Sequence, residues 1–178
     1  MTQTYRLRDA RPSDARLIAD LVRPYADHRI LVSKELIAYF EDIQEFVVAE
    51  PFPGEAPRPG AVAAPVVGCG ALHVMWDDIA EVRTLAVRPD HLHNGLGSAL
   101  LDALNGRARR LDLRRVFCLT FEVDFFARHG FHVIEGTPVG QDVYSQMLRS
   151  HDDGLKEFLD LAAVKPNTLG NTRMLLDL

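Results

Sequence analysis

The 178-residue sequence has little cysteine, no excess of basic charge and no long hydrophobic run. Its two cysteines, Cys69 and Cys118, lie far apart and form no CxxC pair or ligand cluster, so we expect free thiols in a reducing compartment and no metal site. The net charge of −5 argues against a general nucleic-acid-binding protein, which normally carries a basic excess. The N-terminus lacks the apolar core of a signal peptide, and no apolar run approaches the roughly 20 residues that span a bilayer. We therefore expect a cytoplasmic protein with no nucleic-acid or membrane partner.

What is present favours one globular domain. With 178 residues and 47% hydrophobic content, the chain can bury one sizeable core, so a single domain over residues 1–178 is predicted. Residues 51–65 are rich in proline and glycine without periodicity, which predicts a flexible loop inside this domain. Residues 142–178 are expected to form a C-terminal extension with a helix and a strand.

Hydrophobic patterns alternate along the chain between strand and helix periodicity, which predicts an α/β fold. Strands are expected over 4–10, 44–50, 66–76, 79–87, 114–121 and 172–178, and helices over 11–25, 33–43, 97–111, 124–131 and 153–164. Ser13 is the predicted N-cap of the first helix, and Gly130 is predicted to end the short fourth one. The inward-facing residues expected of the second and third helices are Leu36, Ile37, Phe40 and Ile43, and Leu101, Leu104, Ala108 and Leu111.

A glycine pair opens the helix that follows the strand over 79–87. Gly95 and Gly97 lack the third glycine or alanine of a dinucleotide fingerprint, because Leu100 stands at that position, and the GxxxxGK sequence of a phosphate loop is also missing. What remains is a strand, a proline-containing turn and a helix N-terminus on which several backbone N–H groups converge. This arrangement indicates an anion site, with a tight loop that binds nothing as an equal alternative.

Three ordered pieces of sequence resemble the acetyl-coenzyme A binding core of the GCN5-related N-acetyltransferase (GNAT) superfamily. They are Val87-Arg88-Pro89, Gly95-Leu96-Gly97 and the segment from Phe126 to Phe131, and the fold-level resemblance runs from Tyr5 to Ile134. The resemblance implies a mixed central β-sheet, splayed between the cofactor strands and flanked by helices. It also implies acetyl-coenzyme A as cosubstrate.

The resemblance assigns cofactor contacts to the strand end, the glycine turn and the short fourth helix. These residues are Leu85, Ala86, Val87, Leu92, His93, Asn94, Gly95, Leu96, Gly97, Ser98 and Phe126. Two of them depart from the family pattern. Leu92 stands where relatives usually carry Arg or Gln, so a side-chain contact to the pyrophosphate is missing, and Phe126 stands where many carry a tyrosine that can donate a proton. The general acid therefore stays open, with Cys118 and Tyr144 as weak alternatives.

Glu81 matches the position at which many family members carry a catalytic glutamate, so the resemblance implies that it is the general base. The alternative is a carboxylate at a strand end that forms an ion pair.

The resemblance becomes narrower when the whole length is considered. The segments over 29–50, 81–87, 114–131 and 171–178 are similar to the short single-domain amino-acid N-acetyltransferases, or N-acetylglutamate synthases, which begin arginine biosynthesis. This similarity implies L-glutamate as acceptor, with L-glutamine as an alternative, and a homodimer. A dicarboxylate needs cationic partners, for which Lys34, Arg83 and Arg173 are the candidates. Their ordinary alternatives are a surface charge at a helix start, a cross-strand ion pair and a solvated residue on an edge strand.

Two other functions stay open at this point. One keeps the chemistry but changes the acceptor to a protein amine, a polyamine or an antibiotic amine. The other is a non-catalytic acetyl-coenzyme A sensor, which the departures at Leu92 and Phe126 keep open.

Overall fold

The computed structural model describes residues 5–28, 30–31, 34–52, 65–159 and 170–178. The chain forms two compact units, Met1–Val116 together with Leu178, and Phe117–Asp177. The first unit contains β1 (Tyr5–Asp9), η1 (Pro12–Asp14), α1 (Ala15–Asp27), α2 (Leu36–Glu41), η2 (Ile43–Glu45), β2 (Phe46–Pro51), β3 (Gly68–Val74), β4 (Ile79–Val87), η3 (Pro89–His91), α3 (Leu96–Arg110) and the start of β5 (Arg115–Thr120). The second contains the rest of β5, then α4 (Val123–Arg128), β6 (His132–Val133), α5 (Gln141–Met147), α6 (Asp153–Phe158) and β7 (Thr172–Asp177).

The sheet of the first unit is a meander of four antiparallel strands in the order β1-β2-β3-β4. Its hydrophobic runs explain the burial: Phe46–Ala49 in β2 and Ile79–Val82 in β4 are buried throughout, as strands covered on both faces should be. The amides of Arg114 and Arg115 donate to the carbonyl of Asp78, so β5 starts beside the start of β4.

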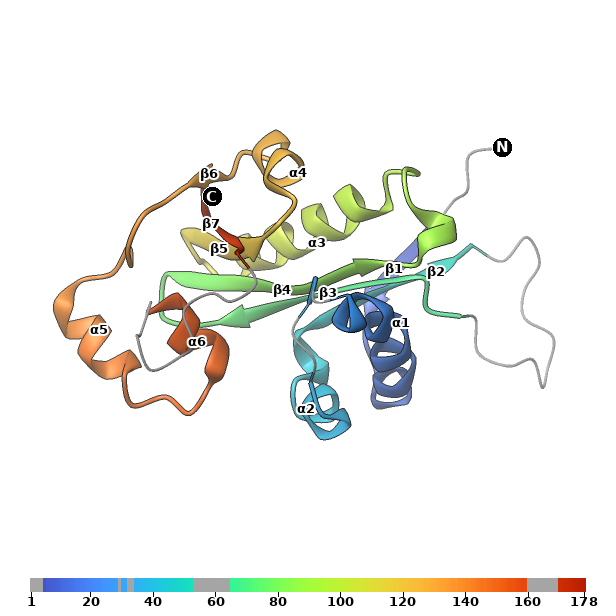
Figure 1. Cartoon of the computed structure of the whole chain (residues 1–178), viewed down its shortest axis with the longest axis horizontal. Helices are drawn as coiled ribbons and strands as arrows, with labels where there is room; N and C mark the ends of the chain where they lie inside the picture. The colour runs from blue at the N-terminus through green and yellow to red at the C-terminus, as the bar shows by residue number, and fades with distance from the viewer. Residues whose placement is uncertain (1–4, 29, 32–33, 53–64, 160–169) are drawn as a thin grey trace. The chain divides into compact units, whose positions relative to one another are not determined.

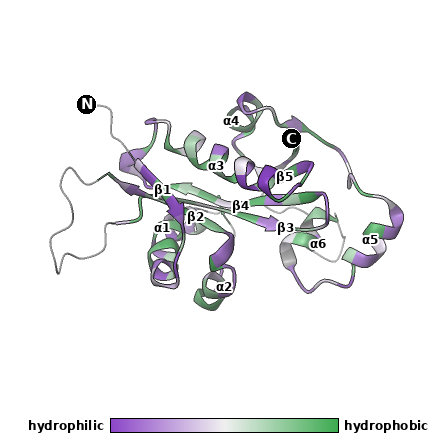
Figure 2. Cartoon of the chain, turned by 180° about the vertical axis from the view of Figure 1, so that it is seen from behind, coloured by the Kyte–Doolittle hydropathy of each residue, from purple (hydrophilic) through white to green (hydrophobic). Residues whose placement is uncertain are grey.

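Helices cover both faces of this sheet, with α1 and α2 on one face and α3 on the other (Figure 1). Alternate residues of β3 belong to opposite faces. A Cβ at Gly70 would lie 2.9 Å from Leu104 of α3, whereas Cys69 and Ala71 belong to the core cluster that contains Ile18 of α1. Figure 2 shows hydrophobic residues along β3 and β4, whereas α1 carries both hydrophobic and hydrophilic residues, as a helix with one buried side does.

In the second unit the strand order is β5-β7-β6, and β7 pairs with β6 in antiparallel register. Phe117 of β5 packs edge-to-face against Phe158 of α6, with ring centroids 4.9 Å apart. Gly130 ends α4 with a φ of 87°, a left-handed conformation in which glycine has no Cβ to clash. The expected helix end at Gly130 is therefore confirmed.

The alternation of strands and helices predicted from the sequence is confirmed, including the bounds of β4, but several local expectations were wrong. Ser13 is not the N-cap of α1: it lies inside η1, and Asp14 occupies the cap position because its carboxylate binds the amide of Arg11 and closes the preceding turn. Ile37 and Phe40 are 62% and 37% exposed, and Tyr39 takes the core position of α2 instead, where its ring packs against Phe46.

Two further differences concern helix and strand ends. Leu111 lies outside the buried stripe because α3 ends at Arg110, and its side chain is half exposed. The short β6 and α5 were not predicted, since neither carries a clear hydrophobic period. Of the predicted loop over 51–65, residues 53–64 lie outside the described residues, as do residues 160–164 of the helix expected over 153–164. No helix among the described residues is long and apolar enough to cross a membrane.

Candidate functional site

The strand β4 is interrupted by a β-bulge at its centre. Cys69 pairs with Ala86 and Ala71 pairs with Arg83, so two residues of β4, Thr84 and Leu85, stand opposite Gly70 alone. Thr84 has a φ of 53°, which a β-branched residue adopts only where surrounding packing holds it. Gly70 accommodates the bulge, because a Cβ there would lie 3.1 Å from Leu85. The bulge therefore changes which way the second half of β4 presents its backbone.

At the end of β4, the backbone N–H and C=O of Val87 point away from β3. The amide of Arg88 donates to the carbonyl of Val67 at 2.8 Å, so in antiparallel pairing the preceding Val87, opposite Gly68, directs its N–H and C=O to the other edge. The Tyr25 hydroxyl of α1 donates to the Val87 carbonyl. Burial raises the pKa of Tyr25, which keeps the hydroxyl protonated as a donor. This edge can accept an extended ligand arm through the Val87 amide.

Side chains hold the turn after β4 in place. The Arg88 guanidinium binds both carboxylate oxygens of Asp90, at 2.6 and 3.0 Å, and also lies 2.6 Å from Nε2 of His91. Hydrogen bonds from Arg88 hold the pKa of Asp90 below its usual value. Because arginine only donates, Nε2 of the buried His91 is an acceptor, and its Nδ1–H donates to the Tyr5 hydroxyl at 3.1 Å. His91 is thus a packed, hydrogen-bonded part of the turn, and the described residues contain no group of three metal-ligating side chains.

The helix that follows begins with an exposed donor group. Gly95 is the N-cap of α3 with a φ of 76°, and the first intrahelical hydrogen bond runs from Ala99 to the Gly95 carbonyl at 3.0 Å. The amides of Leu96, Gly97 and Ser98 precede that bond and have no acceptor within the helix. A Cβ at Gly95 would meet nothing within 4 Å, so the space beside these amides is open. Converging N–H groups at a helix N-terminus fit a pyrophosphate, and Leu92, which is exposed, contributes no hydrogen-bonding side chain to it.

Glu81 and Arg83 lie side by side on β4, before the bulge. Arg83 Nε donates to Glu81 Oε2 at 2.6 Å, and both side chains are buried. Glu81 stands opposite His73 and Arg83 opposite Ala71, so this pair faces the same side of the sheet as α1 and α2. The structure thus brings together the predicted base and one predicted substrate cation. It also contains the ion pair that was the ordinary alternative for Glu81, although Arg83 forms it within β4 and not across strands as expected.

Lys34 lies elsewhere in the first unit. Its Nζ is 3.3 Å from Asp42 Oδ2, and it lines a cleft of about 300 Å³ between α1 and α2. No contact between Lys34 and Glu81 or Arg83 is recorded among the residues that the structure describes. Its use as a substrate contact therefore stays a prediction.

Arg173 belongs to β7 of the second unit. Its guanidinium donates to the carbonyls of Phe158, at 2.5 Å, and Gly136, at 3.1 Å, and stacks on the Phe117 ring with 5.2 Å from Cζ to the centroid. These contacts fix the orientation of the Arg173 side chain. The alternative to substrate binding was a solvated residue on an edge strand, which these contacts do not fit.

Of the remaining predicted residues of the second unit, Phe126 and Cys118 are buried and Tyr144 is partly exposed. Phe126 of α4 packs against Phe125 and Phe131, with ring centroids 5.2 and 5.1 Å away. Cys118 is buried in β5, and the Tyr144 hydroxyl donates to the carbonyl of Leu159 at 3.4 Å. The cofactor role of Phe126 and the identity of a general acid stay predictions.

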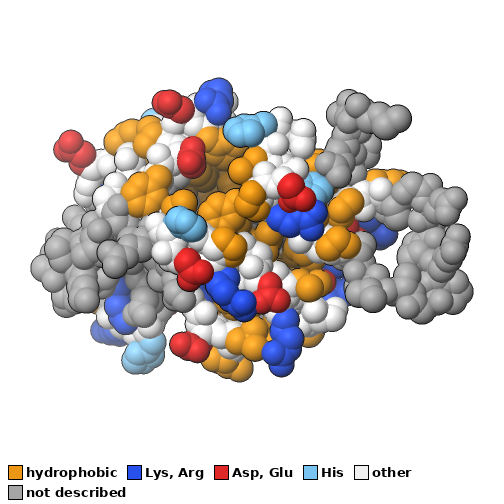
Figure 3. Space-filling model, turned by 45° about the vertical axis from the view of Figure 1, so that its right-hand side comes forward, with side chains coloured by type: hydrophobic (Ala, Val, Ile, Leu, Met, Phe, Trp, Pro, Cys, Tyr) orange, Lys and Arg blue, Asp and Glu red, His pale blue; other side chains and the backbone are white. Residues whose placement is uncertain are grey.

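Sequence reasoning missed two features beside this site. Tyr25 was assigned only to a helix, and nothing in its spacing indicates a bond to β4. His73 and Glu45, whose Nδ1 and Oε1 atoms lie 2.6 Å apart, were also missed, although a histidine near the end of an apolar strand was a visible signal. On the face drawn in Figure 3, acidic and basic side chains are interspersed, with hydrophobic side chains between them.

Comparisons with known proteins agree with this geometry. Residues 19–131 match the acetyltransferase (GNAT) family. An amino-acid acetyltransferase of Mycobacterium tuberculosis is 53% identical over 170 residues, covering 96% of this chain and 92% of that protein. An amino-acid acetyltransferase of Azotobacter vinelandii is 34% identical over 131 residues, which are 72% of this chain but 28% of that longer protein.

Solved structures show the same fold. A Mycobacterium tuberculosis protein in complex with coenzyme A superimposes with a TM-score of 0.85 at 52% identity, covering 97% of this chain and 99% of that one. N-acetylglutamate synthase from Neisseria gonorrhoeae, complexed with coenzyme A and N-acetyl-glutamate, has a TM-score of 0.73 at 22% identity and covers 98% of this chain and 35% of its own. The expected α/β fold with a mixed sheet flanked by helices is thereby confirmed.

Proposed function

Because the chain belongs to the acetyltransferase (GNAT) family, and is an acetyl-coenzyme A-dependent amino-acid acetyltransferase, we propose that it acetylates the α-amine of L-glutamate, with L-glutamine as the alternative acceptor, as the first step of arginine biosynthesis. One observation carries the proposal: a buried carboxylate and a buried guanidinium lie 2.6 Å apart on the bulged strand. The carboxylate can take a proton from the ammonium group of the substrate, and the guanidinium can bind a substrate carboxylate.

Acetyl-coenzyme A is held, in this proposal, at the end of β4 and at the start of α3. The amides of Gly95, Leu96, Gly97 and Ser98 bind the pyrophosphate, and each charge-assisted hydrogen bond contributes ~1.5 to 3 kcal/mol. The pantetheine arm pairs with the backbone of Leu85, Ala86 and Val87, where the Val87 carbonyl is already occupied by Tyr25, so its amide is the group available to the arm. Leu92, His93, Asn94 and Phe126 complete the predicted surroundings of the cosubstrate.

The reaction is a direct transfer in a ternary complex. Glu81 takes a proton from the substrate ammonium, and the resulting amine attacks the thioester carbonyl and forms the C–N bond. Backbone amides of β4 stabilise the developing oxyanion. The C–S bond then breaks, and the leaving thiolate takes up the second proton that the nitrogen loses as the amide forms. Lys34, Arg83 and Arg173 are the cations that recognise the two carboxylates of glutamate. The homodimer and the cytoplasmic location expected from the sequence belong to the same proposal; gel filtration and cell fractionation test them.

The first test is the release of free coenzyme A thiol by the purified chain with acetyl-coenzyme A and each common amino acid, spermidine or a lysine peptide. We expect thiol release to be confined to glutamate or glutamine. Activity confined to another amine would overturn the acceptor. Binding of acetyl-coenzyme A without thiol release across the whole panel would instead identify a sensor.

Two variants test the carboxylate recognition. Lys34→Ala and Arg83→Ala should each raise the KM for glutamate at least tenfold while the Kd for acetyl-coenzyme A stays unchanged. Arg149→Ala is the matched control, since this exposed arginine lies outside that cleft and donates to Gln146 Oε1 near the end of α5. An unchanged KM in both variants would contradict the proposed clamp.

A further inference from the structure

A histidine and a carboxylate lie beside the proposed base, on the strand next to it. His73 of β3 is the Cα partner of Glu81 of β4, and directly opposed residues on antiparallel strands place their Cβ atoms about 4.5–5.5 Å apart on the same face of the sheet. His73 Nδ1 lies 2.6 Å from Oε1 of Glu45, which belongs to η2. Three titratable groups from three elements therefore lie next to one another, in the order Glu45, His73, Glu81.

The Glu45 carboxylate fixes the state of the imidazole. An ionised carboxylate only accepts hydrogen bonds, so the proton of a neutral His73 is on Nδ1 and the lone pair is on Nε2. A carboxylate behind Nδ1 also stabilises the imidazolium that forms when Nε2 takes a proton. Among the described residues, Glu45 is the only hydrogen-bonding or ion-pair partner of the His73 side chain.

Glu81 is buried, whereas His73 and Glu45 are partly exposed, and this difference matters for releasing a proton. The Glu81 side chain is 7% exposed and Arg83 covers one of its oxygens, so a proton placed on Glu81 has little direct access to water. The side chains of His73 and Glu45 are 22% and 24% exposed, and so they reach solvent. A buried base must pass its proton on before the next turnover, and the neighbouring imidazole is the group in position to receive it.

We propose that His73, oriented by Glu45, is a positioning residue that relays the substrate's proton from Glu81 to solvent. Glu81 becomes protonated when it takes the ammonium proton, and His73 Nε2 then removes that proton, directly or through one water, and becomes an imidazolium. The Glu81 carboxylate is thereby restored, and the imidazolium releases its proton to water. Among the described residues of the first unit, the charged groups that face His73 are Glu45 from η2 and Glu81 and Arg83 from β4.

The inference rests on the proposed role of Glu81, so the test includes both. We expect His73→Gln to lower kcat about 10-fold to 100-fold, less than the ~10² to 10⁴ expected for loss of a directly acting base, because water still removes the proton slowly. The KM for acetyl-coenzyme A should not change. The shape of the kcat–pH profile should also change, which a purely structural role would not produce. His151→Gln, at an exposed histidine, is the matched control and should behave as the wild type.

Glu45→Gln keeps an oxygen that can accept from Nδ1 but removes the negative charge. It should therefore fold, lower kcat as His73→Gln does and change the shape of the kcat–pH profile. If His73→Gln fails to fold, this variant decides the question. A wild-type kcat and pH profile in Glu45→Gln, or in a folded His73→Gln, would overturn the relay. Activity retained in Glu81→Gln would overturn the base itself, whereas an inactive Glu81→Gln beside a wild-type His73→Gln would overturn the relay alone.

Discussion

Among individual side chains, the Glu81–Arg83 pair has the strongest consequences, because a buried ion pair is costly to keep unless it is used. Bringing both charges out of water opposes folding, and a hydrophobic pair of similar volume is often as stable or more stable. An interior pair at 2.6 Å on the strand that bears the cosubstrate site is therefore explained better by chemistry than by stability. This physical argument is independent of the family resemblance.

Glu81→Gln tests the base directly. The amide is nearly isosteric and can still accept from Arg83 Nε, but it cannot take a proton at neutral pH. We expect kcat to fall by ~10² to 10⁴, with the Kd for acetyl-coenzyme A within twofold of the wild type by titration calorimetry. Asp124→Asn, in the first turn of α4, is the control for an acid-to-amide change. A kcat within threefold of the wild type in Glu81→Gln would leave Glu81 with only its ion-pair role.

Site residues close in sequence were easier to predict than those that folding brings together. Gly95 could be named as a candidate because the strand, turn and helix around it are contiguous, and the spacing of a contiguous segment is visible in the chain. Glu81 could be named because the same segment resembles the family, and its role as the base stays a proposal. His73 and Glu45 could not, since their contact depends on the register of β3 and on a one-turn 3₁₀ helix, neither of which leaves a local pattern. Ser13 shows the opposite error, in which a good local N-cap residue is displaced because Asp14 has a tertiary partner in Arg8.

In the packing of helices on strands, the close approach of α3 to β3 depends on glycines. A Cβ at Gly70 would lie 2.9 Å from Leu104 of α3 and 3.1 Å from Leu85 in the bulge of β4. The same small residue thus lets α3 dock and leaves room for the bulge that directs the cosubstrate strand. The two functions of Gly70 could not be predicted from the sequence, because they depend on which elements face it.

Two glycine-to-alanine changes should alter the free energy of unfolding in opposite directions. Gly70→Ala should destabilise the fold by about 1–3 kcal/mol, because Leu104 and Leu85 must move to admit a methyl group, and it should weaken acetyl-coenzyme A binding through the bulge. Gly106→Ala should stabilise by about 0.5–1 kcal/mol, because Gly106 is inside α3 and its nearest neighbour, the Arg110 guanidinium, is 3.6 Å from the added Cβ. Urea unfolding measures both. A change in the free energy of unfolding in the same direction for both variants would contradict this account of the packing.

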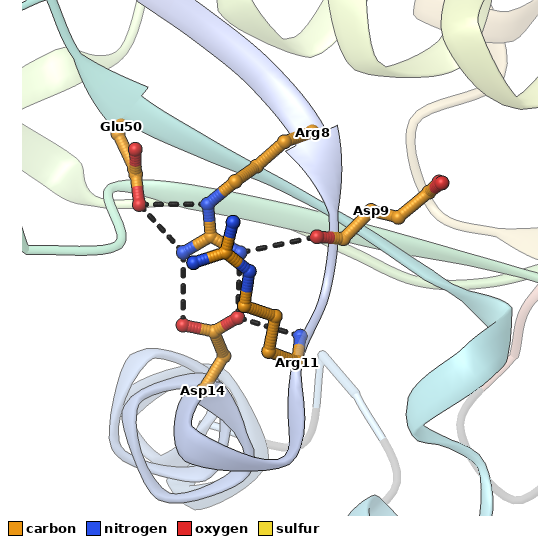
Figure 4. Close-up of polar contacts among 5 residues, drawn as sticks. All are labelled: Arg8, Asp9, Arg11, Asp14 and Glu50. Carbon is orange, nitrogen blue, oxygen red and sulfur yellow. Dashed lines mark hydrogen bonds and ion pairs between the residues drawn. The ribbon is translucent and has the colours of Figure 1, made fainter.

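For the stability of the chain as a whole, one polar cluster joins three parts of the first unit (Figure 4). Arg8 of β1 binds both oxygens of Asp14 in η1, at 2.7 and 3.0 Å, and one oxygen of Glu50 in β2, at 2.5 and 2.8 Å. The Asp14 carboxylate also accepts from the Arg11 amide at 2.7 Å. The carboxylates raise the pKa of Arg8, so this guanidinium is charged under all conditions in which the protein folds.

The Asp14 carboxyl makes the stability of the fold depend on pH in the acidic range. Burial alone would raise the pKa of its carboxyl, but the hydrogen bonds from Arg8 and Arg11 outweigh burial and hold that pKa below its ordinary value. A carboxyl whose pKa is lower in the folded state contributes stability that is fully present above the unfolded-state pKa of about 3.9 and is lost as the pH falls through the folded-state pKa. The cluster should therefore weaken below about pH 4, and not as the pH rises from 5 to 8.

Asp14→Asn isolates this contribution. At neutral pH it should destabilise the protein by about 3 kcal/mol, because Arg8 loses the buried one of its two anionic partners. In a chain of this size, that loss lowers Tm by about 6–12 °C. Between about pH 5 and pH 2 the Tm of the variant should fall less than that of the wild type, so the two curves converge. Asp20→Asn is the control, since its exposed pair with Arg23 contributes at most about 1 kcal/mol. Parallel Tm curves for Asp14→Asn and the wild type down to pH 2 would show that the acid sensitivity comes from other carboxylates.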